Sequence, residues 1–516
     1  MIRIFVCLLV VSSFEFCLCS RVLVVFPVPW RSHAVLGNSV VKTLVETGHE
    51  VTYVTPFPRE MAAERLTYVD VSDALRGYDQ VQLPELLKSP ASQYECMQQG
   101  PDFARRMLQH DAVQALLIGE KFDVVIAEWY FSGLLAPLAF VYSCPLIWYS
   151  APELSWHQLR LMHEPSSPAY SADLTSHHVS LRPYSFWQRV QQMWLQVYLS
   201  AWGYYITNSV ELPAYQDIYQ LPLAINGRML PDYDTLVYNA SLMFVNSHPP
   251  LGQTIPVPGN VRLVGGHHIE LPLPSLQQEL KSVMDKAKAG VILFSLGPDF
   301  LGKVLPQDLK RDLVRTFEHL EQTVVWQMEE KLDFTPKNLY LTNSSQISIL
   351  NHPNTLVLVT VGDIVSMIEA TYTGVPVIGI PLHGDQFSNI DLAVERACAI
   401  RVDVTRYLVR ELKDAINEIV GNYSYRSNAK TSSSIFRRRM PPAHMDLQHW
   451  VQLVVSTRGA THLRSPALGL SFFERYNLDI LAACAMLLWF LSKVVKVVRV
   501  HLREDEHTDR YGKKYQ

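Results

Sequence analysis

Cysteine and charged residues are both scarce in this sequence. Each shortage excludes a class of protein. Of seven cysteines among 516 residues, four fall in the apolar segments at the two ends, which leaves Cys96, Cys144 and Cys398 for the body. Such an odd, scattered set fits neither a disulfide framework nor a metal site with cysteine ligands. The net charge of −4 is too small to indicate binding to nucleic acid.

The first 20 residues predict a secretory signal peptide. Arg3 precedes an apolar run over residues 4–11, and the segment closes with the small residues Cys19 and Ser20. A buried N-terminal strand is the alternative, but the better strand pattern at residues 21–26 follows immediately.

The other end predicts a transmembrane helix over residues 477–499 and a cytoplasmic tail over residues 500–516. The apolar run 480–491 is uninterrupted, but a spanning helix needs about 20 residues, so Lys493 and Lys496 must extend toward the headgroups. A helix lying in the membrane interface is the alternative. Basic residues after the run place the body in the lumen.

Two further features favour the endoplasmic reticulum membrane. Lys513 and Lys514 have the spacing of a dilysine retrieval signal. Acceptor triplets for N-glycosylation begin at Asn239, Asn343 and Asn422, which fits a lumenal body.

Between the two ends, apolar strand patterns alternate with helical ones in two halves, predicted as an N-terminal domain over 21–265 and a C-terminal domain over 266–465. Uninterrupted apolar strands indicate parallel sheets covered on both faces. Helices and loops are expected over 155–235, and a linker in the proline-dense stretch 249–258. The expected strands are 21–26, 51–54, 124–127, 145–148, 290–295, 324–326, 355–360 and 375–380.

Polar side chains stand where two of these strands end. His33 follows the first strand, and Glu128 ends the strand at 124–127. In doubly wound sheets ligands bind at the carboxyl ends of the strands. A carboxylate beside an imidazole there could support general-base chemistry. A competing interpretation, a metal-binding pair at Asp232 and Asp234, lacks a preceding buried strand.

The most specific pattern is residues 360–389, whose spacing resembles the signature of the UDP-glycosyltransferase family. Further short motifs resemble those of the family, so the resemblance covers nearly the whole chain. They lie at 32–33, 122–128, 294–297, 350–353 and 462–466. The matching positions within the signature are Thr360, Gly362, Ser366, Glu369, Ala370, Gly374, Val375, Pro376, Pro381, Asp385, Gln386 and Asn389.

This resemblance implies an α/β GT-B fold, with two doubly wound Rossmann-like domains, and inverting transfer without metal or cofactor. The co-substrate would be UDP-glucose or UDP-glucuronate, and the acceptor a small lipophilic hydroxyl compound. His33 would be the base and Glu128 its orienting partner. The donor would be held by Gln346, Gly362, Ser366, Glu369, Asp385 and Gln386.

Four positions depart from the family pattern around the nucleotide. Asn343 replaces a tryptophan that stacks on uracil, Val361 a histidine, Asp363 a glycine, and Pro298 a serine. Asp363 should cap its own helix but oppose a pyrophosphate. An active transferase and a silent relative, which binds a lipophilic ligand or partners an active paralogue, therefore both remain open. The sequence also leaves open whether the chain forms a homo- or hetero-oligomer.

Overall fold

The computed structural model describes residues 19–58, 63–78, 83–89, 91–92, 97–175, 183–300, 305–328, 332 and 334–512. Most of the predicted signal peptide, together with Cys96, Lys513 and Lys514, lies outside the described residues. The chain divides into two compact units, one ending at Arg464 and the other beginning at Ser465.

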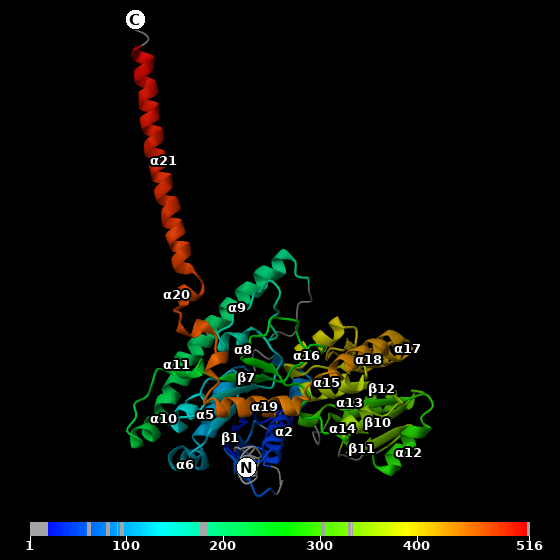
Figure 1. Cartoon of the computed structure of the whole chain (residues 1–516). Helices are drawn as coiled ribbons and strands as arrows, with labels where there is room; N and C mark the ends of the chain where they lie inside the picture. Colours follow the sequence, from blue (N-terminus) through cyan, green and yellow to red (C-terminus); the bar gives the residue numbers. More distant parts are fainter. Residues whose placement is uncertain are drawn as a thin grey trace, which may run out of the picture. The chain divides into compact units, whose positions relative to one another are not determined.

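A seven-stranded parallel sheet forms the N-terminal half of the first unit (Figure 1). Strand β1 lies between β2 and β5, so the strand order reverses beside it. The order is β3 (Leu66–Asp70), β2 (Glu50–Thr55), β1 (Arg21–Val25), β5 (Val124–Glu128), β6 (Leu146–Ser150), β7 (Leu242–Val245) and β8 (Val261–Leu263).

Helices cover both faces of this sheet because successive side chains of each apolar strand point to opposite faces. Val22 and Val24 join the core cluster that includes α2 (Arg31–Glu46). Leu23 and Val25 join the other cluster. The helices of that second face are α5 (Gly100–Leu108), α6 (Asp111–Gly119) and α7 (Pro137–Tyr142).

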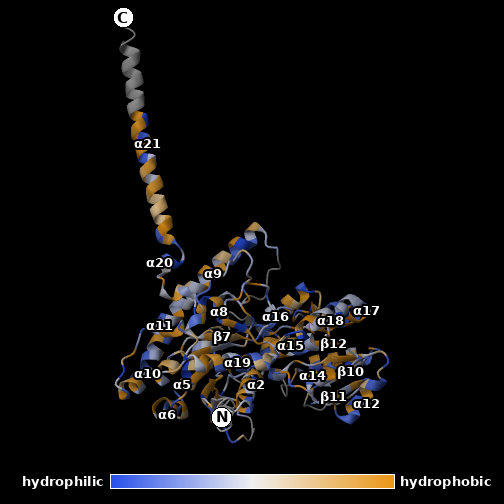
Figure 2. Ribbon diagram, in the orientation of Figure 1, coloured by the Kyte–Doolittle hydropathy of each residue, from blue (hydrophilic) through white to orange (hydrophobic). Residues whose placement is uncertain are grey.

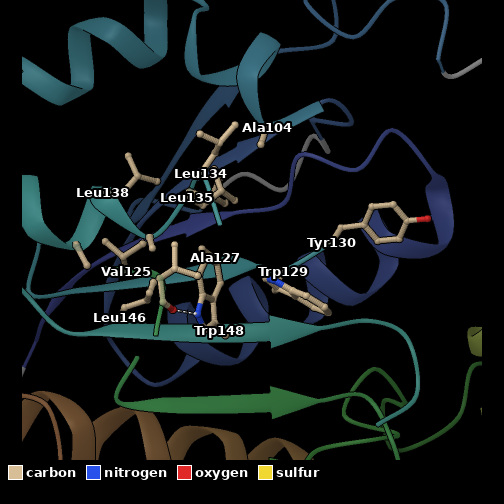
Figure 3. Close-up of a cluster of buried hydrophobic side chains, with 14 of the residues drawn as sticks. Ala104, Val125, Ala127, Trp129, Tyr130, Leu134, Leu135, Leu138, Leu146 and Trp148 are labelled. Atoms are coloured by element: carbon tan, nitrogen blue, oxygen red, sulfur yellow. Dashed lines mark hydrogen bonds between the residues drawn. The ribbon is translucent and has the colours of Figure 1, made fainter. Parts of the chain in front are cut away.

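Figure 3 shows part of the second cluster, in which Trp148 donates from Nε1 to the carbonyl oxygen of Val237 over 3.3 Å. Trp129 and Tyr130 lie at the end of β5, away from Val125 and Leu138. The carboxyl end of β5 therefore carries large aromatic side chains.

A six-stranded parallel sheet forms the C-terminal half, and its order reverses at the β9–β12 pair. Every predicted strand is present in one of the two sheets, with ends shifted by at most two residues. The order is β11 (Leu339–Thr342), β10 (Thr323–Gln327), β9 (Val291–Phe294), β12 (Thr355–Thr360), β13 (Val377–Gly379) and β15 (Ala399–Arg401). Strands β3, β7, β8, β11 and β15 were not predicted.

The helices of this half include the ones that carry the predicted donor residues. They are α12 (Gln278–Lys286), α13 (Gln307–Glu318), α14 (Gln346–Leu350), α15 (Ile364–Thr373), α16 (Gln386–Glu395), α17 (Leu408–Gly421), α18 (Tyr423–Arg437) and α19 (Ala443–Ser456).

The two halves are joined at several places. Leu447, Val451 and Val454 of α19 belong to the same core cluster as α2 and β1, and Figure 1 shows these elements side by side. A short parallel pair, β4 (Ala91–Ser92) with β14 (His383–Gly384), adds backbone hydrogen bonds between the halves.

The linker prediction is wrong for residues 249–258, because they connect β7 to β8 within one sheet. The chain passes to the second sheet only after Leu263. Proline density marked an irregular loop there, and local composition cannot say which sheet the next strand joins.

The described residues of the region 155–235 form helices and loops, as predicted. It contains α8 (Trp156–Leu161), α9 (Phe186–Ile206), a π-helical turn (Thr207–Glu211), α10 (Leu212–Ile225) and α11 (Tyr233–Val237). Asp232 accepts from the Thr235 N–H over 3.0 Å and caps α11, which is a structural role for that carboxylate.

In the second unit, α21 runs from Leu478 to Gly512. Its segment Leu478–Val500 has a mean hydropathy of 2.0 and is long and apolar enough to cross a membrane. Figure 2 shows this apolar stretch. By length and composition it agrees with the predicted helix at 477–499.

Candidate active site

His33 and Glu128 meet where the first sheet reverses its strand order. His33 is in the first turn of α2, the helix that follows β1 after a short loop, and Glu128 is the last residue of β5. Strands β1 and β5 are paired in parallel, with Val25 opposite Ala127. Their carboxyl ends are therefore adjacent, which brings the two predicted residues together.

The two side chains form a buried pair. His33 Nδ1 lies 2.5 Å from Glu128 Oε1, and the two residues are 5% and 1% exposed. Burial lowers the pKa of His33, but attraction to Glu128, Asp385 and Asp299 outweighs burial, so the pKa is raised. Because the carboxylate accepts, Nδ1 carries the proton and Nε2 keeps its lone pair. This arrangement can take a proton from an acceptor hydroxyl.

Asp363 occupies the start of α15, beside the reversal of the second sheet. It caps the helix as predicted, since Oδ1 accepts from the Ser366 N–H over 3.0 Å. Among the described residues, Oδ2 has no hydrogen-bond partner. Burial, with the neighbouring carboxylates of Asp299 and Asp385, raises the pKa of Asp363 to about 7.

Two glycines shape the loops around this carboxylate. Gly297 and Gly362 have φ values of +84° and +89°, which favour glycine. A Cβ on Gly297 would collide with the carboxylate of Asp363. The N-terminal end of α15, where a phosphate would find backbone N–H groups, therefore holds a carboxylate of the protein itself.

Three of the predicted donor residues form a second group. Gln346 Nε2 donates to Ser366 Oγ over 3.0 Å and to Glu369 Oε2 over 2.8 Å. Burial raises the pKa of Glu369 to about 8. A carboxyl group and a hydroxyl held in this way can bind the hydroxyls of a ribose, so the predicted role stays chemically reasonable.

Asp385 precedes α16 and Gln386 is its first residue, and the two side chains have different surroundings. Asp385 Oδ2 accepts from Asn389 Nδ2 over 3.1 Å, and burial raises the pKa of Asp385 although His33 opposes the change. Gln386 Oε1 accepts from the N–H groups of Leu382 and His383. Gln386 therefore orders the loop before it, while Asp385 faces the charge of His33.

Asp299 and His383 belong to this site and were not predicted. Asp299 Oδ1 accepts from the Ser32 N–H over 3.0 Å, so a residue of the second half caps the helix that carries His33. Burial lowers the pKa of His383 to about 4, and its ring lies 5.1 Å from that of Trp30. Asp299 also follows a strand, which is the signal that could have identified it.

A cavity of about 370 Å³ opens beside the end of β5. Glu211, whose carboxylate accepts from Ser132 Oγ over 2.7 Å, adds one buried polar group to its wall. His33 is not among the lining residues. The aromatic part of the lining includes Trp129, Phe131, Trp156, Trp202 and Tyr204.

Comparison with known proteins identifies the family of the chain. The family described as "UDP-glucoronosyl and UDP-glucosyl transferase" matches residues 21–505. The chain belongs to the UDP-glycosyltransferase family.

UDP-glucosyltransferase 2 of Dactylopius coccus is 28% identical over 93% of this chain and 92% of its own length. UDP-glucuronosyltransferase 2B14 of Oryctolagus cuniculus is 28% identical over 64% of this chain and 60% of its own length.

Solved glycosyltransferases confirm the GT-B fold. The glycosyltransferase of kitacinnamycin aligns with a TM-score of 0.56 at 19% identity, over 85% of this chain and 99% of its own. The calicheamicin glycosyltransferase CalG4 aligns with the same TM-score at 15% identity and the same coverage. At these identities the likeness concerns the fold alone.

Within this UDP-glycosyltransferase, the four departures lie in different surroundings. Val361 is fully buried in the apolar cluster of the second sheet, so it faces the core. Asn343 is exposed after β11, and Pro298 begins the short turn that carries Asp299. Of the four, Asp363 alters the charge of the site.

Proposed function

We propose that this chain is an inverting UDP-glycosyltransferase that moves a neutral hexose, glucose, from UDP-glucose to a small lipophilic hydroxyl compound. The buried contact between His33 and Glu128 carries the proposal. His33 Nε2 removes the proton of the acceptor hydroxyl, the hydroxyl oxygen attacks the anomeric carbon, and UDP departs with the bonding electrons. Glu128 stabilises the imidazolium that forms.

The choice of glucose over glucuronate rests on the charge around the donor. Burial, with the nearby carboxylates of Asp299 and Asp385, raises the pKa of Asp363. Asp299 and Asp385 are also close enough to His33 to raise its pKa. A sugar with its own carboxylate would meet this negative charge in a buried place, where repulsion is weakly screened. The Dactylopius relative, named as a glucosyltransferase, supports the same choice.

For the acceptor, the support is the aromatic wall of the cavity beside β5. Apolar pockets with a few polar groups are typical of small-molecule sites. Trp129 and Phe131 line this cavity, and both are close in sequence to Glu128. We therefore place the lipophilic body of the acceptor in this cavity.

For location, we propose a lumenal body, a membrane helix at Leu478–Val500, and a cytoplasmic tail in the endoplasmic reticulum membrane. The apolar helix and the basic residues that follow it support this topology. A signal peptide over residues 1–20 would deliver the body to the lumen.

A silent, ligand-binding relative is the second candidate, and Asp363 is the observation that favours it. Its carboxylate lies at the helix end where a pyrophosphate would bind. The N–H of Ser366 already donates to the carboxylate of Asp363, so it is not available to a phosphate. A protein that has lost donor affinity could still hold a lipophilic compound in the cavity.

The test is a panel of phenols assayed with UDP-glucose and with UDP-glucuronate, beside calorimetric titration of both donors. Glucoside formation by the wild-type chain, lost in His33→Ala, supports the proposal. Equal use of both donors would refute the charge argument. Acceptor binding without donor binding or turnover would establish the silent candidate.

A further inference from the structure

His157 is a largely buried histidine in the wall of the cavity beside β5. It stands in the first turn of α8, where Ser155 accepts from its backbone N–H over 3.4 Å and forms a capping box with Gln158. Its side chain is 10% exposed. Because the start of the helix is capped in this way, the backbone that carries the imidazole is held in place.

Two aromatic rings fix the orientation of the imidazole. The ring of Trp156 stacks on it, with 3.8 Å between the ring centroids and 29° between the ring planes. The ring of Phe131 meets it edge-on at 5.4 Å. Both aromatic residues also line the cavity. The imidazole is therefore a rigid part of an aromatic wall.

The hydrogen-bonding capacity of this imidazole is not used within the described part of the chain. Nε2 is buried without a partner there, and the side chain makes no hydrogen bond to another described residue. Asp173 Oδ2 lies 3.8 Å from Nε2, beyond hydrogen-bond range, and accepts from Trp156 Nε1 instead. Of the two nitrogens only Nε2 is fully enclosed, so Nδ1 is the one that a ligand can reach.

The charge state of His157 decides which ligand group fits Nδ1. Burial lowers the pKa of His157 to about 4, although attraction to Asp173 opposes the change. The imidazole is therefore neutral at neutral pH. The carboxylate of Asp173 favours the proton on Nε2, the nearer nitrogen, so Nδ1 keeps its lone pair. A ligand group that donates a hydrogen bond, such as a hydroxyl, fits Nδ1, and a group that can only accept does not.

Glu211, a buried acid of the same wall, is occupied by bonds within the protein. Its Oε1 accepts from Ser132 Oγ over 2.7 Å and from the Gly133 N–H over 2.9 Å. Its Oε2 accepts from Thr207 Oγ1 over 3.0 Å. These bonds hold the cavity wall together. Of the two side chains, His157 is the one with an unused lone pair.

We propose that His157 is a specificity-determining residue whose Nδ1 accepts a hydrogen bond from a hydroxyl on the aromatic body of the acceptor. The cavity then selects aromatic compounds with two hydroxyls, one that receives the sugar and one that binds His157. The inference rests on the proposed function, because it takes this cavity as the acceptor site. An analogue that lacks the second hydroxyl leaves the nitrogen unpaired in an apolar wall, which costs affinity.

Binding calorimetry of the purified full chain, without any donor, tests the proposal. One ligand pair is p,p′-biphenol with p-phenylphenol, and the other is a dihydroxynaphthalene with the corresponding naphthol, so that the members differ in the second hydroxyl. In at least one pair the dihydroxy compound should bind the wild type about tenfold more tightly, on the scale of one hydrogen bond.

Three variants assign this preference. His157→Phe keeps a ring that can stack on Trp156 and should reduce the ratio of affinities to about one. His157→Gln restores an acceptor oxygen and should recover part of the preference. His319→Phe alters an exposed histidine at the end of α13, away from the cavity, and should leave the ratio unchanged.

The outcomes separate this inference from the function on which it rests. Equal affinity within both pairs in the wild type would overturn the role of His157 and keep the cavity as the acceptor site. So would a preference that persists in His157→Phe, or an equal loss of affinity for both members of a pair, which would mean that the ring only packs. Binding of none of the four compounds would refute the acceptor site itself. Donor affinity and turnover do not enter the measurement.

Discussion

At the scale of single residues, His33 can act as a base only while its imidazole is neutral. Its pKa is raised, chiefly because attraction to Glu128 outweighs burial. Protonation at low pH removes the base, so activity should rise with pH, with a midpoint above the ordinary histidine value of about 6.5. His33→Ala should lower kcat by about 10²–10⁴ while leaving donor affinity unchanged.

Glu128→Gln should shift the rise of activity with pH, which reports deprotonation of His33, to lower pH. The amide can still accept from Nδ1 but no longer carries the charge that raises the pKa of His33. The plateau should also fall, roughly tenfold or more, because the imidazolium loses its counter-charge. The measurement is kcat/KM against pH for both proteins. A limb at the same pH in both would mean that Glu128 does not control the base.

Asp363 should make donor binding depend on pH. Its pKa is about 7, so the carboxyl group is mostly neutral below that value and charged above it. The charged form opposes the pyrophosphate, and affinity for UDP-glucose should therefore fall as pH rises through about 7. UDP-glucose is the suitable probe because its pyrophosphate diester does not titrate in this range.

Asp363→Asn should weaken the pH dependence, leaving the part that comes from Glu369, whose pKa is about 8. It should also tighten binding at high pH by about tenfold or more, on the scale of one nearby charge. Asparagine can still cap α15. Asp308→Asn, which alters a side chain that is 91% exposed, is the control. Calorimetry at about pH 6 and about pH 8 decides, and a wild-type affinity that is equal at both would contradict the prediction.

At the scale of elements, α2 depends on the other half of the molecule for its cap. Trp30 at its start provides no side-chain acceptor, and its first turn has no acidic residue. Asp299 fills that role through the Ser32 N–H. The two loops are thereby joined one residue away from the base.

Asp299→Ala should destabilise the protein by about 0.5–2 kcal/mol, the usual cost of losing a helix cap. It should also lower the pKa of His33, since one attracting carboxylate is removed. Thermal unfolding and the pH profile report the two effects independently. Asp308→Ala in the first turn of α13 is the matched control, and equal stability of the two variants would show that Asp299 does not cap α2.

At the scale of the whole molecule, location should depend on the last residues. Replacing Lys513 and Lys514 with serine should move the protein toward the cell surface, because a retrieval receptor reads the pair. Surface biotinylation of intact cells measures the change. Arg503→Ser, which alters a basic residue of the same tail, should leave location unchanged. A wild-type chain already at the surface would refute the retrieval signal.

The sequence by itself determined the features that depend on local order. Uninterrupted apolar runs form strands wherever both faces of a sheet are covered, so β1, β5, β9 and β12 could be found from composition alone. The residues that follow such strands must lie at one edge of the sheet, which is why His33 and Glu128 could be recognised. Asp363 was found only because it departs from the family signature.

Only the tertiary structure decided which residues from the two halves meet. Asp299 reaches the start of α2 because two loops far apart in sequence face each other, and a sequence pattern carries no such distance. The same holds for α19, whose apolar side joins the core of the N-terminal sheet, and for β8, which closes that sheet after the proline-dense loop. The surroundings of His157 also required the structure, because Asp173 and Phe131, which lie beside its ring, come from separate segments of the chain.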